Sequence, residues 1–266
     1  MEETIGKFLD TNVVFDATFE LRKNRKNFLN FMKNFKYKEL LVETVVTLEA
    51  IEIIAETFGL ITPIIRNVIF NSDWDNLDDK RKQAVLTEIY NKIKYDEEIS
   101  KGNRSDFALA EYNVLFPSFL METKENIQIL LRTLPDQYTE HFRMRLEDMF
   151  EIFQAYMEDA DYNNFNSELK RLNVDKTIFK EKDSNDFKIL CSLLSILQFG
   201  GQDNTYGEHH EFSNINLYGR DSDFFKNIEN FKKIIETNTD NSYINLDHIK
   251  EDLKHLLPLH PYQTKT

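Results

Sequence analysis

The strongest constraint on the fold is the alternation of short apolar strands with amphipathic helices at both ends of the 266-residue chain. At the N-terminal end we expect a strand over residues 5–9, a helix over 17–35, a second strand over 40–46, and then a helix that Thr47 caps. A strand–helix–strand–helix order is typical of a parallel sheet. Such a sheet usually places its functional loops at the carboxyl ends of its strands.

The middle of the chain, over residues 59–179, changes to a succession of helical patterns. In "PDQYTEHFRMRLEDMFEIFQAYM" six apolar residues recur at steps of three and four and are predicted to share one helical stripe: Phe142, Leu146, Met149, Phe150, Phe153 and Met157. Such a stripe has to pack against a partner surface.

The α/β pattern then resumes. We expect a helix over "SNDFKILCSLLSILQF", a strand over "FSNINLY", a helix over "SDFFKNIENFKKII", a strand over "SYINL", and a last helix that Asp247 caps. Neither α/β half could bury its strands alone. We therefore predict one α/β domain, formed by residues 1–58 and 180–266 around a central parallel sheet flanked by helices, which a large α-helical insert over 59–179 interrupts.

Composition restricts the functional class. The net charge of −13 argues against non-specific coating of nucleic acid, although it allows a local basic site. No stretch resembles an apolar membrane span, and the acidic start Met1-Glu2-Glu3 differs from a secretion signal. The single cysteine, Cys191, lies in an apolar helical pattern and is interpreted as a core thiol. We expect a cytoplasmic protein with no membrane association.

Acidic residues follow the predicted strands or open the predicted helices at Asp10, Glu49, Asp186 and Asp221, with Asp223 close by. In an open parallel sheet these positions converge on one edge. Clustered carboxylates repel one another unless a divalent cation compensates their charge. Ligation by oxygen alone suits Mg²⁺ or Mn²⁺.

The segments "FLDTNVVFD", "VVTLEAI", "SNDFKILCSLL" and "LYGRDSDFF" resemble, in this order, the signature of the PIN domain nucleases. The resemblance implies an α/β fold with a central parallel sheet and hydrolysis of RNA that depends on Mg²⁺ or Mn²⁺. It also implies that Asp10, Glu49, Asp186 and Asp221 form the catalytic acidic cluster, with Asp223 as a supplementary metal ligand. Thr11 and Asn12 would orient Asp10 through hydrogen bonds.

Each piece also has a plainer interpretation. Asp-Thr-Asn can be a turn, and Asp186 and Asp221 can cap helices, an interpretation that we favour for each piece taken singly. Taken jointly, the four pieces favour a shared metal site. Glu43 and Glu52 are alternatives to Glu49.

Basic residues on the predicted helix over 17–35 offer a place for a phosphate backbone. Four of them lie together on a helical wheel beside an apolar face and could contact a phosphate backbone: Arg22, Lys26, Lys33 and Lys36. A helix face that is simply exposed to solvent is an equally good interpretation of the same pattern. Arg220, next to Asp221, is a further candidate for substrate binding.

Two other features are interpreted as structural. "SDWDNLDD" lacks the spacing of a calcium loop and is predicted to begin a helix. His209 and His210 are predicted to lie in a surface loop with no partner at metal-ligand spacing. The sequence thus predicts an endoribonuclease, with a toxin, defence or RNA-processing role left open. The alternative is a catalytically silent PIN-like scaffold whose helical insert docks a protein partner.

Overall fold

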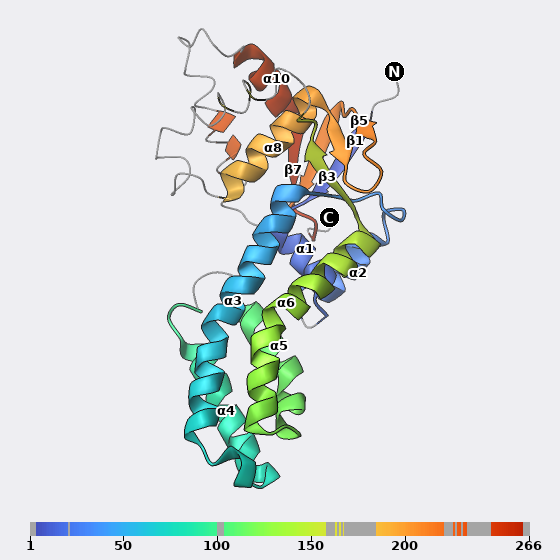
Figure 1. Ribbon diagram of the computed structural model, residues 1–266. Coiled ribbons are helices and arrows are strands. Elements are labelled where there is room, and N and C mark those ends of the chain that lie inside the picture. The colour runs from blue at the N-terminus through green and yellow to red at the C-terminus, as the bar shows by residue number, and fades with distance from the viewer. Residues whose placement is uncertain are drawn as a thin grey trace. The chain divides into compact units, whose positions relative to one another are not determined.

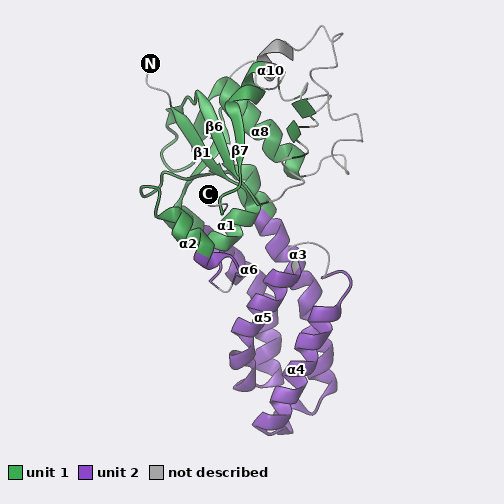
Figure 2. Ribbon diagram, turned by 180° about the vertical axis from the view of Figure 1, so that it is seen from behind, with its two compact units in different colours: residues 1–17, 27–49, 146–266 green, residues 18–26, 50–145 purple. Residues whose placement is uncertain are grey.

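The computed structural model describes residues 4–20, 22–99, 104–157, 185–220 and 246–262, and eight single positions between these ranges (Figure 1). The chain divides into two compact units, which Figure 2 colours green and purple. Unit 1 comprises residues 1–17, 27–49 and 146–266, and unit 2 comprises residues 18–26 and 50–145.

Unit 1 is built on a mixed seven-stranded sheet in the order β5-β4-β3-β2-β1-β6-β7. Its strands are β1 (Ile5–Leu9), β2 (Leu41–Glu43), β3 (Glu151–Ala155), β4 (Gly201–Asp203), β5 (His209–His210), β6 (Asn214–Tyr218) and β7 (Leu256–Leu259). The five strands from β3 to β7 in this order are parallel, and β4 and β5 add an antiparallel hairpin at one edge. The predicted α/β class is therefore confirmed.

Helices cover both faces of this sheet. Phe8 pairs with Leu41 and Leu217 in the ladder, so these side chains share one face, which α8 (Asn185–Phe199) packs against. Tyr218 faces the opposite side and contacts Phe31 of α2 (Arg25–Met32), with ring centroids 5.1 Å apart. The other helices of unit 1 include α1 (Thr11–Thr18) and α10 (Leu246–His255), and α10 lies against α8.

Unit 2 consists of helices in the residues described. They are the greater part of α3 (Thr44–Asn71), the short η1 (Trp74–Asn76), α4 (Asp79–Tyr95), α5 (Arg104–Leu120) and most of α6 (Lys124–Met149). Asp78 caps α4 by accepting the amide of Arg81 at 2.8 Å, which confirms the predicted helix start in "SDWDNLDD". Trp74 is buried, and its indole N–H donates to the carbonyl of Glu122 at 2.9 Å.

Helix α3 is long and apolar enough, by length and composition, to cross a membrane, which the sequence analysis did not anticipate. Its most apolar 18-residue window has a mean hydropathy of 1.5, and 39% of that window is buried in the protein. One such helix is weak evidence for a span. Its buried residues recur at steps of three and four, as on the core face of an amphipathic helix: Ala50, Ile54, Phe58, Ile61 and Ile65.

Several predicted elements are confirmed. The strand over residues 5–9 has the predicted bounds, and the helix that begins near Asp186 and the strand over 214–218 are also present. Residues 226, 228, 229, 231 and 232 of the next predicted helix are helical. Most of "SYINL" lies outside the described residues, and the edge strand β7 was not predicted.

The prediction of one helix over residues 17–35 is wrong. Helix α1 begins at Thr11, directly after β1, and ends at Thr18, and α2 begins only at Arg25. Asp10 therefore stands at the N-cap position of α1, where its carbonyl accepts the amides of Val13 and Val14.

The prediction that residues 150–157 continue a helix is also wrong. Helix α6 ends at Met149, and β3 then pairs with β2 and β4, with Phe153 and Ala155 buried. The segment "EIFQA" alternates in burial along the strand, which a stripe counted at helical spacing conceals. The boundary of unit 2 at residue 145 consequently precedes the predicted end of the insert at 179.

Candidate functional site

The order of the parallel strands identifies the edge of the sheet that suits a ligand. When the five parallel strands are numbered 1 to 5 in chain order, their order across the sheet is 3-2-1-4-5, so the direction in which successive strands are added reverses between β1 and β6. In open α/β sheets, ligands bind beyond the carboxyl ends of the strands at this point. Asp10 follows β1 here, and its amide donates to the carbonyl of Tyr218 on β6 at 2.9 Å.

Two of the predicted site segments meet at this edge. Thr11 Oγ1 donates a hydrogen bond to Glu49 Oε2, which joins the first residue of α1 to the second turn of α3. Asp10 is 5% exposed. The structure therefore brings the Asp-Thr-Asn turn and Glu49 together, although they are far apart in sequence.

Arg220, which follows β6, is held by groups that sequence reasoning missed. Its Nε lies 3.0 Å from Oδ2 of Asp16 in an ion pair, and its guanidinium donates to the carbonyl of Asn12 at 3.5 Å. Asp16 is 0% exposed and also accepts the hydroxyl of Tyr262 at 3.1 Å. No local pattern in the sequence points to Asp16, because its partners Arg220 and Tyr262 lie far from it in the chain.

Glu43 at the end of β2 is a second buried acid at this edge. It is 2% exposed, accepts the hydroxyl of Ser192 at 2.6 Å, and accepts the amide of Val45. Burial raises the pKa of Glu43 to about 7, against the opposing effect of these hydrogen bonds. Glu43, which the sequence offers only as an alternative to Glu49, lies in the sheet, whereas Glu49 lies on the helix.

The remaining predicted ligands are placed only in part. Asp186 lies in the first turn of α8, as predicted. Asp221 and Asp223 lie outside the described residues. Within the described ranges, Asp10, Glu49 and Asp186 do not form a group whose ligand atoms all lie within 4.8 Å of one another. The described residues of the predicted site therefore do not by themselves bring three ligand atoms together.

The basic residues do not form the predicted ridge on one helix. Arg22 lies between α1 and α2 and is only 7% exposed. Lys26 is exposed on α2, whereas Lys33 and Lys36 follow the end of that helix, and Lys33 donates to the side chain of Asn30 at 3.0 Å. The helical-wheel interpretation is wrong because α1 ends at Thr18 and α2 begins only at Arg25.

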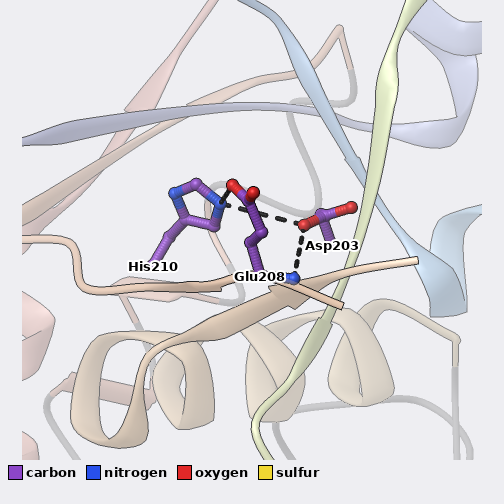
Figure 3. A group of neighbouring side chains, drawn as sticks. All are labelled: Asp203, Glu208 and His210. Atoms are coloured by element: carbon purple, nitrogen blue, oxygen red, sulfur yellow. Dashed lines mark hydrogen bonds and ion pairs between the residues drawn. The ribbon is translucent and has the colours of Figure 1, made fainter. Parts of the chain in front are cut away.

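The β4–β5 hairpin carries a group that could hold a metal ion, Asp203, Glu208 and His210 (Figure 3). Their ligand atoms lie within 4.8 Å of one another, and Nε2 of His210 is 3.9 Å from Asp203 Oδ2 and 4.0 Å from Glu208 Oε2. The prediction that His209 and His210 lie in a loop without such partners is therefore wrong. The hairpin brings together residues that a search for linear metal motifs does not connect.

Asp203 also organises the hairpin. Its carboxylate accepts the amides of Thr205 at 3.0 Å, Tyr206 at 2.6 Å and Glu208 at 2.8 Å. Burial opposes the charged form of Asp203, but these hydrogen bonds and the nearby His210 outweigh it and hold its pKa below the usual range. Gly207, at a φ of +70°, supplies the left-handed residue that the tight turn requires.

Comparison of the chain with protein-family models, with curated proteins and with solved structures gives no match. The function is therefore inferred from the residues and their geometry. The donor chemistry at the sheet edge fits a hard divalent cation, because Asp10 and Glu49 offer carboxylate oxygens at the place where a parallel sheet binds ligands.

Proposed function

We propose that the chain is a PIN-like endoribonuclease that uses Mg²⁺ or Mn²⁺ at the carboxyl edge of its parallel sheet. The observation that carries the proposal is the hydrogen bond from Thr11 to Glu49. It joins two segments of the PIN-like signature at the reversal point of the strand order. Asp186 at the start of α8 and Arg220 after β6 belong to the other two segments.

In this proposal Asp10, Glu49, Asp186 and Asp221 would hold the ion. When bound, such an ion would supply a water of lowered pKa and would offset negative charge on the phosphate. The Thr11 hydroxyl fixes one oxygen of Glu49, which leaves the other oxygen for ligation. No nucleophilic side chain is needed, which agrees with the assignment of the buried Cys191 to the core.

The ion pair with Asp16 orients the guanidinium of Arg220 beside α1, and the remaining N–H groups of Arg220 are proposed to donate hydrogen bonds to the substrate. RNA is the proposed substrate, and the cytoplasm is the proposed compartment. The alternative remains a scaffold that retains the sheet edge but hydrolyses nothing and binds a protein partner through unit 2.

The test is incubation of the purified chain with labelled RNA and labelled DNA, with and without Mn²⁺, beside Asp10→Asn and Asp148→Asn. Asp148 is an exposed acid of unit 1 and serves as the matched control. We expect metal-dependent cleavage of RNA by the wild type and by Asp148→Asn only. Cleavage by Asp10→Asn at the wild-type rate would refute the assignment, and an inactive wild type would favour the scaffold.

A further inference from the structure

Glu43 ends β2 on the strand next to the one that Asp10 follows. Phe8 pairs with Leu41 in the parallel β1–β2 ladder, so continuing the register by two residues sets Asp10 beside Glu43. Neighbouring strands are about 4.8 Å apart, and paired residues of a ladder share a face. The side chain of Glu43 thus stands on the face of the sheet that α8 covers, one strand from Asp10.

The two carboxylate oxygens of Glu43 bind two different helices. Oε1 accepts the hydroxyl of Ser192, in the second turn of α8, at 2.6 Å. Oε2 accepts the amide of Val45 in the first turn of α3. Capping α3 needs only one acceptor, which a serine or threonine could supply. The second oxygen gives Glu43 a role that capping does not explain.

The same two helices carry two of the acids of the proposed site. Glu49 lies one turn beyond Val45 on α3, and Asp186 lies six residues before Ser192 on α8. Six residues of helix span about 9 Å. A change in the spacing of α3 and α8 at Glu43 would therefore be transmitted to Glu49 and Asp186.

The burial of Glu43 also argues for a specific role. Removing a carboxylate from water costs several kcal/mol unless hydrogen bonds compensate it, and an apolar side chain at this position would avoid that cost. A valine or isoleucine would suit the end of a buried strand, but it could not link the two helices.

We propose that Glu43 and Ser192 form a positioning pair that fixes the spacing of α3 and α8 at the carboxyl edge of the sheet and thereby holds Glu49 and Asp186 for the cation. This inference rests on the proposed function. Neither Glu43 nor Ser192 is itself proposed to touch the ion or the RNA.

The test compares Ser192→Ala with Ser195→Ala on the same helix. The hydroxyl of Ser195 is buried and donates to the carbonyl of Cys191 in its own helix at 2.9 Å, so it makes no link between helices. The readout is the thermal midpoint of unfolding as a function of Mn²⁺ concentration, which gives an apparent metal affinity without any substrate. Asp10→Asn defines the part of the response that belongs to the sheet edge.

We expect Ser192→Ala to weaken the apparent Mn²⁺ affinity about tenfold or more, as is usual for residues that orient metal ligands. Ser195→Ala should titrate as the wild type does, and Ser192→Thr, which keeps the hydroxyl, should recover most of the affinity. The double variant Glu43→Leu/Ser192→Ala should bind Mn²⁺ no more weakly than the weaker-binding of the two single variants, because each single change already removes the same hydrogen bond.

The outcomes separate this inference from the proposed function. Suppose that Asp10→Asn loses the metal response and the cleavage, whereas Ser192→Ala and Ser195→Ala titrate alike and differ only in their metal-free midpoints. The positioning pair is then refuted, and the nuclease stands. Should Asp10→Asn retain both the response and the cleavage, the proposed function falls and the inference falls with it.

Discussion

Among the residues that the structure describes, each of the two units buries one glutamate whose pKa is raised to about 7, and the two carboxyl groups have very different partners. Glu43 in unit 1 accepts hydrogen bonds from a hydroxyl and from amides at the start of a helix. Glu111 in unit 2 is 4% exposed, accepts a hydrogen bond from Tyr138, and is stabilised in its charged form by Arg145 and Arg22. In both cases burial is the main cause of the raised pKa.

The difference lies in what the partners connect. Arg145 donates to the carbonyl of Thr18 at 2.6 Å and pairs with Glu20 at 3.0 Å, so the network around Glu111 ties the segment 18–26 to the helices of unit 2. The partners of Glu43 belong to helices that carry proposed ligands. We infer that the buried carboxyl group of unit 2 anchors a segment of that unit, whereas that of unit 1 serves the site.

The largest expected effect is on the rate of RNA cleavage, which should depend on a residue of unit 1 and not on a residue of unit 2. Asp10→Asn removes a proposed ligand and should lower the rate of RNA cleavage by about 10³-fold or more. Glu111→Gln should cleave at close to the wild-type rate below its melting temperature, because Glu111 lies in the other unit. Single-turnover cleavage in Mn²⁺ measures both. A comparable loss of activity in Glu111→Gln would show that unit 2 contributes to the chemistry.

The next largest effect is on the pH dependence of the free energy of unfolding of unit 2. The folded pKa of Glu111 is about 7, above its unfolded value, so the folded state holds a proton that the unfolded state releases. Its contribution to the free energy of unfolding should therefore be highest below about pH 4.5 and fall by up to ~3 kcal/mol as the pH rises to about 7.

Trp74 allows this effect to be measured in unit 2, because it is the only tryptophan in the chain and is buried there. Urea unfolding followed by Trp74 emission at pH 5, 6 and 7 should show a smaller loss of stability in Glu111→Gln than in the wild type. The exposed Glu88→Gln, also in unit 2, is the control and should keep the wild-type slope. Equal slopes for Glu111→Gln and the wild type would mean that Glu111 titrates normally.

Elements set by local patterns could be predicted from the sequence, whereas elements that depend on contacts between distant residues could not. The strand over 5–9, the helix that begins near Asp186 and the strand over 214–218 could be predicted from local patterns, because burial there follows one period. The strand β3 could not, since its apolar residues continue the stripe of α6 and only pairing with β2 selects the extended form. Local preference was outweighed by pairing within the sheet.

The candidate site shows the same limit. Asp10 and Glu49 were found because a strand end and a helix start leave local signals, and the structure joins them through Thr11. The pairing of Asp16 with Arg220 and the link from Glu43 to Ser192 cross about 150 residues or more, and no local period reports them. The starts of α1 and α3 could not be predicted either. Each helix begins within two residues of a short strand, β1 of five residues or β2 of three, which leaves too little sequence to mark the helix start.

A smaller effect concerns the hydroxyl of Thr11. Thr11→Val keeps the shape of the side chain but removes the hydrogen bond to Glu49, and we expect about a tenfold loss of apparent Mn²⁺ affinity. Thr11→Ser keeps the donor and should lose much less. Calorimetric titration with Mn²⁺ compares the two variants. Identical affinities would show that Glu49 does not depend on Thr11, and would weaken the observation that carries the proposed function.

The smallest expected effect concerns the β4–β5 hairpin of unit 1, and it tests whether the hairpin takes part in the chemistry proposed for the sheet edge. Glu208 is exposed on the hairpin, so Glu208→Gln should change the free energy of unfolding by less than about 0.5 kcal/mol and leave RNA cleavage unchanged. It should nevertheless weaken any binding of Zn²⁺ or Mn²⁺ at the hairpin, because it removes one of three donors.

Glu211→Gln, which changes an exposed acid just beyond β5, is the matched control. Melting midpoints with each metal, measured in an Asp10→Asn background, isolate the hairpin from the sheet edge. If Glu208→Gln abolished cleavage as Asp10→Asn is expected to do, the hairpin would share the catalytic ion, and the assignment of the chemistry to the sheet edge alone would be wrong.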